Sequence, residues 1–490
     1  MSEATGIRFG STAGRWVLGA TVLGSGIVFL DGTVVNVALP AIAEDLDAEL
    51  SGLQWTLDAY LVTLSALLLL GGSLGDLYGR RRMFVLGLIG FTLASILCGV
   101  APNIEALIGA RALQGAGGAL LVPGSLAIIS ASFHPDDRGR AVGAWSGLAG
   151  VSTAIGPFFG GWLIDAVSWR LVFLINVPLA IVAVLVATRH VPESRDTTST
   201  PRPDLAGAAA VSLGLAGLAY ALIEGAGDMT ATTWTMAVLG VIGLVAFVTI
   251  EARGAHPMLP LEVFRSRQFT GANLTTLAVY TGLGGATFLL VLQLQVVLGY
   301  SALEAGASLL PVTLLMLVLS ARAGNLAQHI GPRLPMTAGP LVVAAGLMLF
   351  ARVEAGSTYL ASVLPAAVVF GLGLALTVAP LTATVLASVD ERHLGVGSGV
   401  NNAVARVAGL LAVALLPALV GLDTSSSTGL SAGFVDAMHI AAGICLAGAL
   451  VAWATIRSAT PVPDTTQPSV LQPCHDPSVA EPAGPARSAR

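Results

Sequence analysis

The stretch GGSLGDLYGRRR (Gly71–Arg82) decides how the rest of the chain is interpreted. It follows LDAYLVTLSALLLL (Leu57–Leu70), a run that carries no charge after Asp58, and it combines glycines, one aspartate and three arginines. A change from apolar to basic residues is typical either of a surface loop or of the cytoplasmic end of a membrane-spanning helix. The remaining sequence distinguishes these two interpretations.

The composition indicates an all-α polytopic membrane protein. Of the 490 residues, 55% are hydrophobic and only 10% are charged, whereas soluble domains carry about a quarter charged residues. The net charge of −5 gives no reason to expect a nucleic-acid partner. All basic residues are arginines, so the chain lacks the lysine of an ATP-binding P-loop. The dispersed cysteines and histidines show no metal-ligand spacing, so we expect no metal and no cofactor.

A membrane-spanning helix needs about 20 apolar residues, and fourteen such stretches can be placed. The predicted spans are 16–39, 52–74, 83–101, 105–131, 139–164, 170–188, 205–224, 234–252, 270–297, 304–325, 334–352, 358–388, 394–420 and 433–456. With the N-terminus inside, every arginine lies on the cytoplasmic side except Arg111, Arg170, Arg352 and Arg406. This bias indicates that both termini are cytoplasmic.

A weak internal repeat relates the two ends of the chain. The spacing from Gly72 to Gly79, after the second span, recurs from Gly324 to Gly331, after the tenth. The repeat predicts two six-helix halves with two helices inserted between them, and substrate bound between the halves. The predicted segments are a cytoplasmic N-terminus (1–15), a first half (16–188), a linker (189–204), two inserted helices (205–252), a second linker (253–269), a second half (270–457) and a disordered cytoplasmic tail (458–490).

Four motifs resemble those of the major facilitator superfamily, in the order and on the spans where its members carry them. GGSLGDLYGRRR resembles the signature between spans 2 and 3, although Leu77 stands where a basic residue is usual. RALQGAGGA, from Arg111, resembles the span 4 motif, and Gly147–Gly161 resembles the span 5 motif of antiporters. LDGTVVNVALP (Leu30–Pro40) resembles span 1 of the 14-span drug:proton antiporters. The resemblance implies the family's fold and proton-coupled efflux.

The same motifs suggest where the protein changes conformation. Glycines allow close helix contact, a proline removes a backbone hydrogen bond, and an aspartate can cap the N-terminus of a neighbouring helix. The alternatives are a plain basic anchor at the membrane surface and ordinary packing of small residues. The expected gating residues are Gly72, Asp76, Gly79, Arg80, Gly156, Pro157, Gly160 and Gly161.

Three charges are predicted to share one layer of the first half, where an unpaired charge is costly. At 1.5 Å per residue, Asp31 lies roughly 13 Å, and Asp58 and Arg111 roughly 9 Å, below the outer surface. Burial favours a protonated carboxyl, whereas a nearby arginine favours the charged form. We therefore expect Asp31 to carry the proton, with Arg111 as its modulator and Asp58 as a further candidate. A static ion pair is the alternative.

Polar residues inside other parts of the spans are candidates for the substrate cavity. These are Gln114, Asn401, Asn402 and Arg406. The predicted function is proton-driven export of lipophilic small molecules, most simply multidrug efflux, by a monomer in a bacterial cell membrane. The alternatives are a dedicated exporter of one endogenous metabolite or antibiotic, a proton-coupled importer and a membrane-embedded enzyme. The last is disfavoured because the chain has no HExxH or GxSxG motif.

Overall fold

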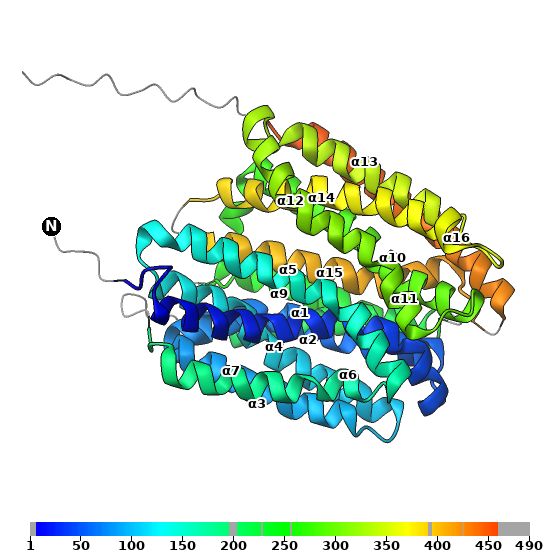
Figure 1. Ribbon diagram of the computed structural model, residues 1–490, viewed down its shortest axis with the longest axis horizontal. Helices are drawn as coiled ribbons and strands as arrows, with labels where there is room; N and C mark the ends of the chain where they lie inside the picture. Colours follow the sequence, from blue (N-terminus) through cyan, green and yellow to red (C-terminus); the bar gives the residue numbers. More distant parts are fainter. Residues whose placement is uncertain are drawn as a thin grey trace, which may run out of the picture.

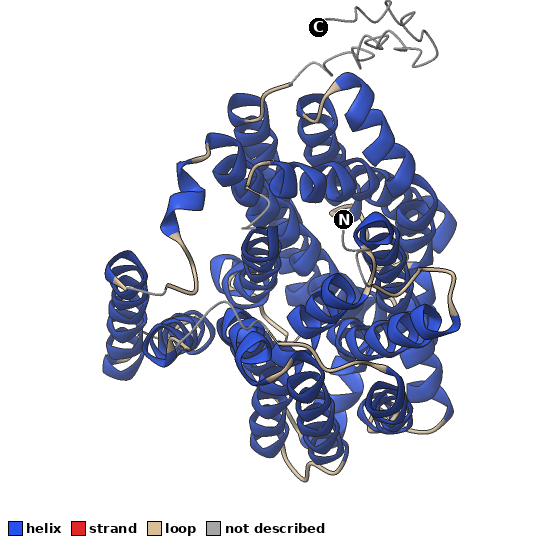
Figure 2. Ribbon diagram, turned by 90° about the vertical axis from the view of Figure 1, so that its left-hand side faces the viewer, coloured by secondary structure: helices blue, strands red, loops and turns tan. Residues whose placement is uncertain are grey.

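The computed structural model describes residues 6–195, 203–226, 229–254, 257–390, 394–424 and 426–458. Figure 2 looks along the helix axes and shows this part of the chain as helices joined by loops. Among the described residues, 14 helices are long and apolar enough to cross a membrane, which confirms the predicted all-α membrane fold. The predicted tail lies outside the described residues beyond Ser458.

The first six spans form one half of the bundle, in blue to cyan-green along the lower side of Figure 1. The sixth span is a short helix followed by a longer one. The helices are α1 (Thr12–Leu46), α2 (Leu50–Tyr78), α3 (Arg80–Gly99), α4 (Ile104–Ser132), α5 (Pro135–Ala166), α6 (Leu171–Leu174) and α7 (Asn176–His190).

The last six spans form the second half, and three of them contain a break or a π-helical turn. Their helices are α10 (Arg267–Leu292) with the π-turn Gln293–Val297, α11 (Ala302–Ser308) followed by α12 (Leu310–Ile330), α13 (Arg333–Phe350), the π-turn Tyr359–Val363 leading into α14 (Leu364–Ala387), α15 (Leu394–Val420) and α16 (Ser427–Thr455). A short 3₁₀ helix, Leu261–Arg265, precedes them.

The two halves repeat one packing scheme. In the first half α2 and α3 pack on α4, and α1 packs on α5; in the second, α12 and α13 pack on α14, and α10 packs on α15. The predicted repeat falls at equivalent points of this scheme. Gly79 separates α2 from α3 with φ 108°, and Gly331 ends α12 with φ 83°. Both values lie in the region that glycine tolerates without a steric cost.

The two inserted helices, α8 (Leu205–Glu224) and α9 (Ala231–Arg253), lie outside the repeat. Helix α8 packs on both α2 and α15, and it therefore covers the seam between the halves. Helix α9 packs on α8, where Gly217 and Gly240 bring the two backbones close together. Much of α9 is exposed apolar surface, including Trp234 and Val245, as expected for a helix that faces lipid.

Hydrogen bonds join the halves at the end of the bundle where α5 finishes and α11 begins, which we call the closed end. Asp165 accepts hydrogen bonds from the backbone N–H groups of Ala302 (3.2 Å) and Leu303 (2.9 Å). The side chain of Gln54 donates to the carbonyl oxygen of Val413 over 2.6 Å. Gln295 donates in the same way to Val37 over 3.0 Å. Figure 1 shows α5 and α11 converging at this end.

Glycines make this contact as close as it is. A Cβ atom at Gly161 would overlap the backbone carbonyl of Ala302, and one at Gly306 would overlap that of Pro157. On a different neighbour of α5, Gly156 and Gly160 fit against Thr33 and Val34 of α1. The antiporter-like motif is therefore the surface on which α5 packs against both α1 and the second half.

The opposite end carries Gly79 and Arg80–Arg82, and we call it the arginine end. Here the first part of α5 lacks such neighbours: a Cβ atom at Gly139, Gly143, Gly147 or Gly150 would meet nothing within 4 Å. The halves therefore diverge along α5 toward the arginine end. Along the other seam α2 and α15 remain in contact, with Leu69 against Gly399.

We predict that Gly161→Ala weakens the closed end more than Gly147→Ala, a matched change on the same helix. The added methyl at position 161 overlaps backbone, and overpacking of this kind costs about 1–3 kcal/mol. The apparent Tm of the purified protein in detergent should fall for Gly161→Ala and stay close to wild type for Gly147→Ala. Equal Tm values for the two variants would contradict the close α5–α11 contact.

Candidate functional site

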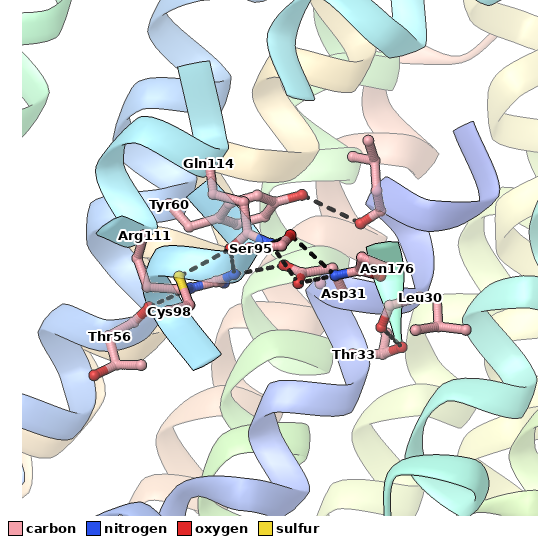
Figure 3. Close-up of polar contacts among 12 residues, drawn as sticks. Leu30, Asp31, Thr33, Thr56, Tyr60, Ser95, Cys98, Arg111, Gln114 and Asn176 are labelled. Carbon is pink, nitrogen blue, oxygen red and sulfur yellow. Dashed lines mark hydrogen bonds and ion pairs between the residues drawn. The ribbon is translucent and has the colours of Figure 1, made fainter. Parts of the chain in front are cut away.

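A buried carboxylate in α1 is the centre of a polar cluster in the first half (Figure 3). The side chain of Asp31 is 0% exposed, and its Oδ2 lies 2.5 Å from an Nη atom of Arg111 on α4. Arg111 is 1% exposed, so neither charge reaches water. Such a pair is stable only where further hydrogen bonds satisfy both groups. The predicted association of Asp31 with Arg111 is thus present in the structure.

Neutral side chains from two more helices complete the shell around the carboxylate. Asp31 Oδ1 accepts from the amides of Gln114, over 2.8 Å, and of Asn176 on α7, over 3.1 Å. Both amides also donate to the hydroxyl oxygen of Ser95 on α3, over 2.8 and 3.3 Å. The charged carboxylate is therefore surrounded by hydrogen-bond donors, which stabilise its negative charge.

Arg111 also makes contacts beyond its ion pair with Asp31. Its Nε donates to the backbone carbonyl of Thr56 over 2.9 Å, and an Nη atom donates to the Gln114 side-chain oxygen over 2.6 Å. The guanidinium also lies over the ring of Tyr60, 4.2 Å from the centroid. These contacts join α1, α2 and α4 around a single pair of opposite charges.

Sequence reasoning missed two members of the shell, Ser95 and Asn176. A serine inside an apolar helix is common and does not by itself indicate a functional site. Asn176 had a usable signal, because it is an amide inside an apolar span and lies two residues before Pro178. Pro178 cannot donate to the carbonyl of Leu174, where α6 ends, and α7 begins at Asn176. The helix break thus coincides with the polar residue.

Asp58 does not join this cluster. It lies two residues from Tyr60 on α2, and residues so spaced point about 200° apart around a helix. It instead shares a face with Gln54, which contacts α15, so Asp58 is directed toward the seam between the halves. Asp58 is 0% exposed, and among the described residues its carboxyl oxygens have no hydrogen-bond partner. The similar predicted depth of Asp58 and Arg111 therefore does not bring their side chains together, because the two side chains point in different directions.

The residues expected to line the substrate cavity divide into different environments. The structure corrects the prediction that Gln114 lines the substrate cavity. Gln114 is 0% exposed, and both the nitrogen and the oxygen of its amide form hydrogen bonds in the Asp31 shell. Asn401 donates to Asn273 and Thr276 within the second half. Asn402 donates to the carbonyl of Ser398 in its own helix. These two amides form contacts inside one half.

Arg406 differs from these amides because it crosses between the halves. It belongs to α15, yet its guanidinium lies 5.4 Å from the ring centroid of Phe29 on α1 and close to Gly32. It is partly exposed, and no ion pair with it is found among the described residues. A partly accessible cation near the middle of a span, at a seam, is a functional-site candidate.

The motif at the arginine end is tied to the chain that follows α7. Asp76 pairs with Arg80 over 2.8 Å, one turn along the chain, in this conformation. The carboxylate of Glu193 accepts hydrogen bonds from the backbone N–H groups of Arg81 (3.1 Å) and Arg82 (3.2 Å). Gly72 has room for a Cβ atom, with Pro123 at 3.6 Å. The predicted gating role of these residues stays a prediction.

The geometry defines a class of protein: a membrane transporter with two repeated helical halves and a buried charge pair in one of them. The chain belongs to the Major Facilitator Superfamily, whose family model matches residues 21–413. Members of this family are transporters and not enzymes, in agreement with the prediction.

Several relatives of known name are similar over most of their length. The puromycin resistance protein pur8 of Streptomyces alboniger is 36% identical, with 94% of each chain covered. The methylenomycin A resistance protein of Bacillus subtilis is 32% identical, over 90% of this chain and 94% of that protein. The multidrug transporter protein MdtP of Bacillus subtilis is 33% identical, over 80% of this chain and 72% of that protein.

Solved transporter structures share the fold. The transporter PepTSo, of the POT family, superposes with a TM-score of 0.66 at 14% identity and covers 90% of this chain and 97% of its own. A bacterial homologue of the lysosomal transporter Spinster, in an inward-facing and unoccupied conformation, gives a TM-score of 0.63 at 17% identity, over 91% and 98%. Both likenesses bear on the fold alone.

We predict strong energetic coupling between Asp31 and Arg111. Arg111→Leu leaves a buried carboxylate without its counter-charge and should destabilise the protein by about 3–5 kcal/mol. Asp31→Asn in the same chain removes that stranded charge, so the double variant should be more stable than Arg111→Leu alone. Thermal unfolding of the wild type, both single variants and the double variant measures this cycle. Additive effects would mean that the two charges do not interact.

Proposed function

We propose that the protein exports lipophilic small molecules in exchange for protons, with Asp31 as the proton carrier. The observation that carries this proposal is the fully buried Asp31–Arg111 pair, in the half opposite the partly accessible Arg406. Burial favours the neutral form of a carboxyl, and a nearby arginine favours the charged form. A modest rearrangement of the two halves can therefore change its affinity for a proton.

The coupling follows from what each form of Asp31 needs. The charged form is stabilised by Arg111 and by the surrounding amides, and the neutral form leaves Arg111 without its counter-charge. Conformations that separate the two side chains favour protonation, and conformations that bring them together favour release. Asp58, at the seam between the halves, is the second candidate for a proton-carrying group.

The relatives' names support an efflux function. Resistance to puromycin, resistance to methylenomycin A and multidrug transport are stated of those proteins. We infer the same class of activity here, in the cell membrane of a bacterium, with a monomer as the working unit, no cofactor, and both termini in the cytoplasm. The arginine end is then cytoplasmic, and contact at the closed end shuts the outer side, as an inward-facing state requires.

We place the cargo between the two halves, at the level of Arg406 and Phe29. Arg406 and Asn402 lie one turn apart on one face of α15, and the guanidinium reaches α1. The contacts of Gly156, Pro157, Gly160 and Gly161 at the closed end, with Gly72, Asp76, Gly79 and Arg80 at the arginine end, form the two gates. Opening the outer side then requires α5 to leave α11.

A reconstituted system tests proton coupling directly. Liposomes that contain the purified protein and an internal pH-sensitive dye are given a pH gradient, and puromycin is then added. Wild type should move protons when the compound is added, and Asp31→Asn should not, because an amide cannot carry a proton. The Arg111→Lys variant retains a positive charge but loses the planar guanidinium that also donates to Thr56 and Gln114, so it should retain coupling at a reduced rate.

The same assay separates Asp31 from Asp58. Asp58→Asn preserves the shape of a buried, unpaired carboxyl, so we expect its proton movement to stay within about twofold of wild type, which is less than 0.5 kcal/mol in barrier height. Loss of proton movement in Asp58→Asn, with wild-type behaviour in Asp31→Asn, would transfer the coupling role to Asp58.

A dedicated exporter of one endogenous metabolite or antibiotic is the second candidate. Relatives named for single compounds, puromycin and methylenomycin A, favour it. It uses the same coupling site and differs only in cargo. A panel of chemically unrelated lipophilic compounds in the liposome assay distinguishes the two, since a dedicated exporter responds to one scaffold only.

A further inference from the structure

We propose that Asn176 is a positioning residue that serves both protonation states of Asp31 by turning its side-chain amide over. The inference rests on the proposed function, because it takes Asp31 to be the group that binds the proton. Asn176 begins α7, directly after the break between α6 and α7. The reason for this role is that protonated Asp31 needs a hydrogen-bond acceptor among its neighbours.

Only one of the two polar atoms of the Asn176 amide has hydrogen-bond partners. Its Nδ2 atom donates to Asp31 Oδ1 over 3.1 Å and to Ser95 Oγ over 3.3 Å. The residue is 0% exposed, and among the described residues its Oδ1 atom has no hydrogen-bond partner. A buried carbonyl oxygen without a donor is unusual, because most buried polar atoms are paired.

The unpaired oxygen becomes useful when Asp31 gains a proton. The neutral acid has an O–H group, which needs an acceptor. Arg111 has no acceptor atom, and the side-chain oxygen of Gln114 already accepts from Arg111 over 2.6 Å. The hydroxyl oxygen of Ser95 already accepts from Gln114 and Asn176. Among the described side chains of this shell, Asn176 Oδ1 is the acceptor that remains free.

A half-turn about the Cβ–Cγ bond of Asn176 exchanges its nitrogen and oxygen in nearly the same space. With the nitrogen toward Asp31, the amide donates to the carboxylate. With the oxygen toward Asp31, it accepts from the O–H of the acid. The shell therefore switches from all donors to one acceptor with no movement of the helices.

The titratable and charged groups around Asp31 cannot replace this switch. They are Arg111 from α4, Tyr60 from α2 and Cys98 from α3, with Arg406 of α15 beyond Gly32. Tyr60 uses its hydroxyl to donate to the carbonyl of Val28 over 3.2 Å. Cys98 donates to Gln114 over 3.6 Å. Asn176 and Gln114 are the neutral amides that donate to Asp31, and of the two only Asn176 has an oxygen without a partner among the described residues.

Infrared difference spectroscopy of the purified protein tests the proposal. The carbonyl band of protonated Asp31 is the band that titrates with pH in wild type and is missing in Asp31→Asn. In Asn176→Leu the carboxylate loses one of its three side-chain donors and keeps Arg111 and Gln114. The acid loses its one free acceptor, which leaves a buried O–H group unpaired, and we take this loss to be the larger of the two. The pH midpoint of the band should therefore fall by about one unit, a tenfold loss of proton affinity.

Two further variants control for damage to the fold. Ser125→Ala removes a buried hydroxyl of the same half that lies outside the shell, where it contacts Ser25 and the carbonyl of Thr21, so its midpoint should stay near that of wild type. Asn176→Ser retains an atom that can both donate and accept, and it should recover part of the shift. In wild type, an amide carbonyl band that is absent from Asn176→Leu should titrate in step with Asp31.

The outcomes distinguish this inference from the proposed function. If no carboxyl band is lost in Asp31→Asn, Asp31 does not bind the proton and the proposed function fails at this residue. If the band titrates but has the same midpoint in wild type and Asn176→Leu, Asp31 is the carrier and the role of Asn176 is wrong. An unchanged amide band in wild type would overturn the switch in the same way.

Discussion

The interaction on which the first half depends is the contact between Asp31 and Arg111. Two opposite charges without access to water are tolerated only because residues of α2, α4 and α7 form hydrogen bonds with them, while Ser95 of α3 holds the two amides in place. That requirement fixes the positions of these helices and of α1 relative to one another. It also means that adding or removing one proton changes the balance of forces at the centre of the half.

The second constraint is the closeness of α5 and α11. Gly161 and Gly306 allow backbone to touch backbone, and Asp165 joins the same two elements by hydrogen bonds. Contacts of this kind are either fully made or broken, because small residues leave no side chain that could bridge a partial gap. The closed end is thus suited to act as a gate with two states.

Much of the fold could be predicted from the sequence, because long apolar stretches and arginine bias are properties of single helices. A pairing of Arg111 with a carboxylate of the same half could be predicted as well, because an unpaired charge inside a span is costly. The direction of Asp58 could not, because depth along a helix says nothing about which neighbour a face meets. Gln114 was wrongly predicted to line the cavity because the neighbour that its face of the helix meets could not be predicted either. Ser95 and Asn176 matter only through their spatial neighbours.

The most direct test of the central claim, that Asp31 links cargo movement to protons, is an exchange experiment with labelled puromycin in liposomes. Asp31→Asn holds a neutral side chain at this position, so it should still exchange labelled for unlabelled compound at equal pH on both sides. It should fail to accumulate the compound when a pH gradient is applied. Accumulation equal to wild type, or loss of both activities, would contradict the account.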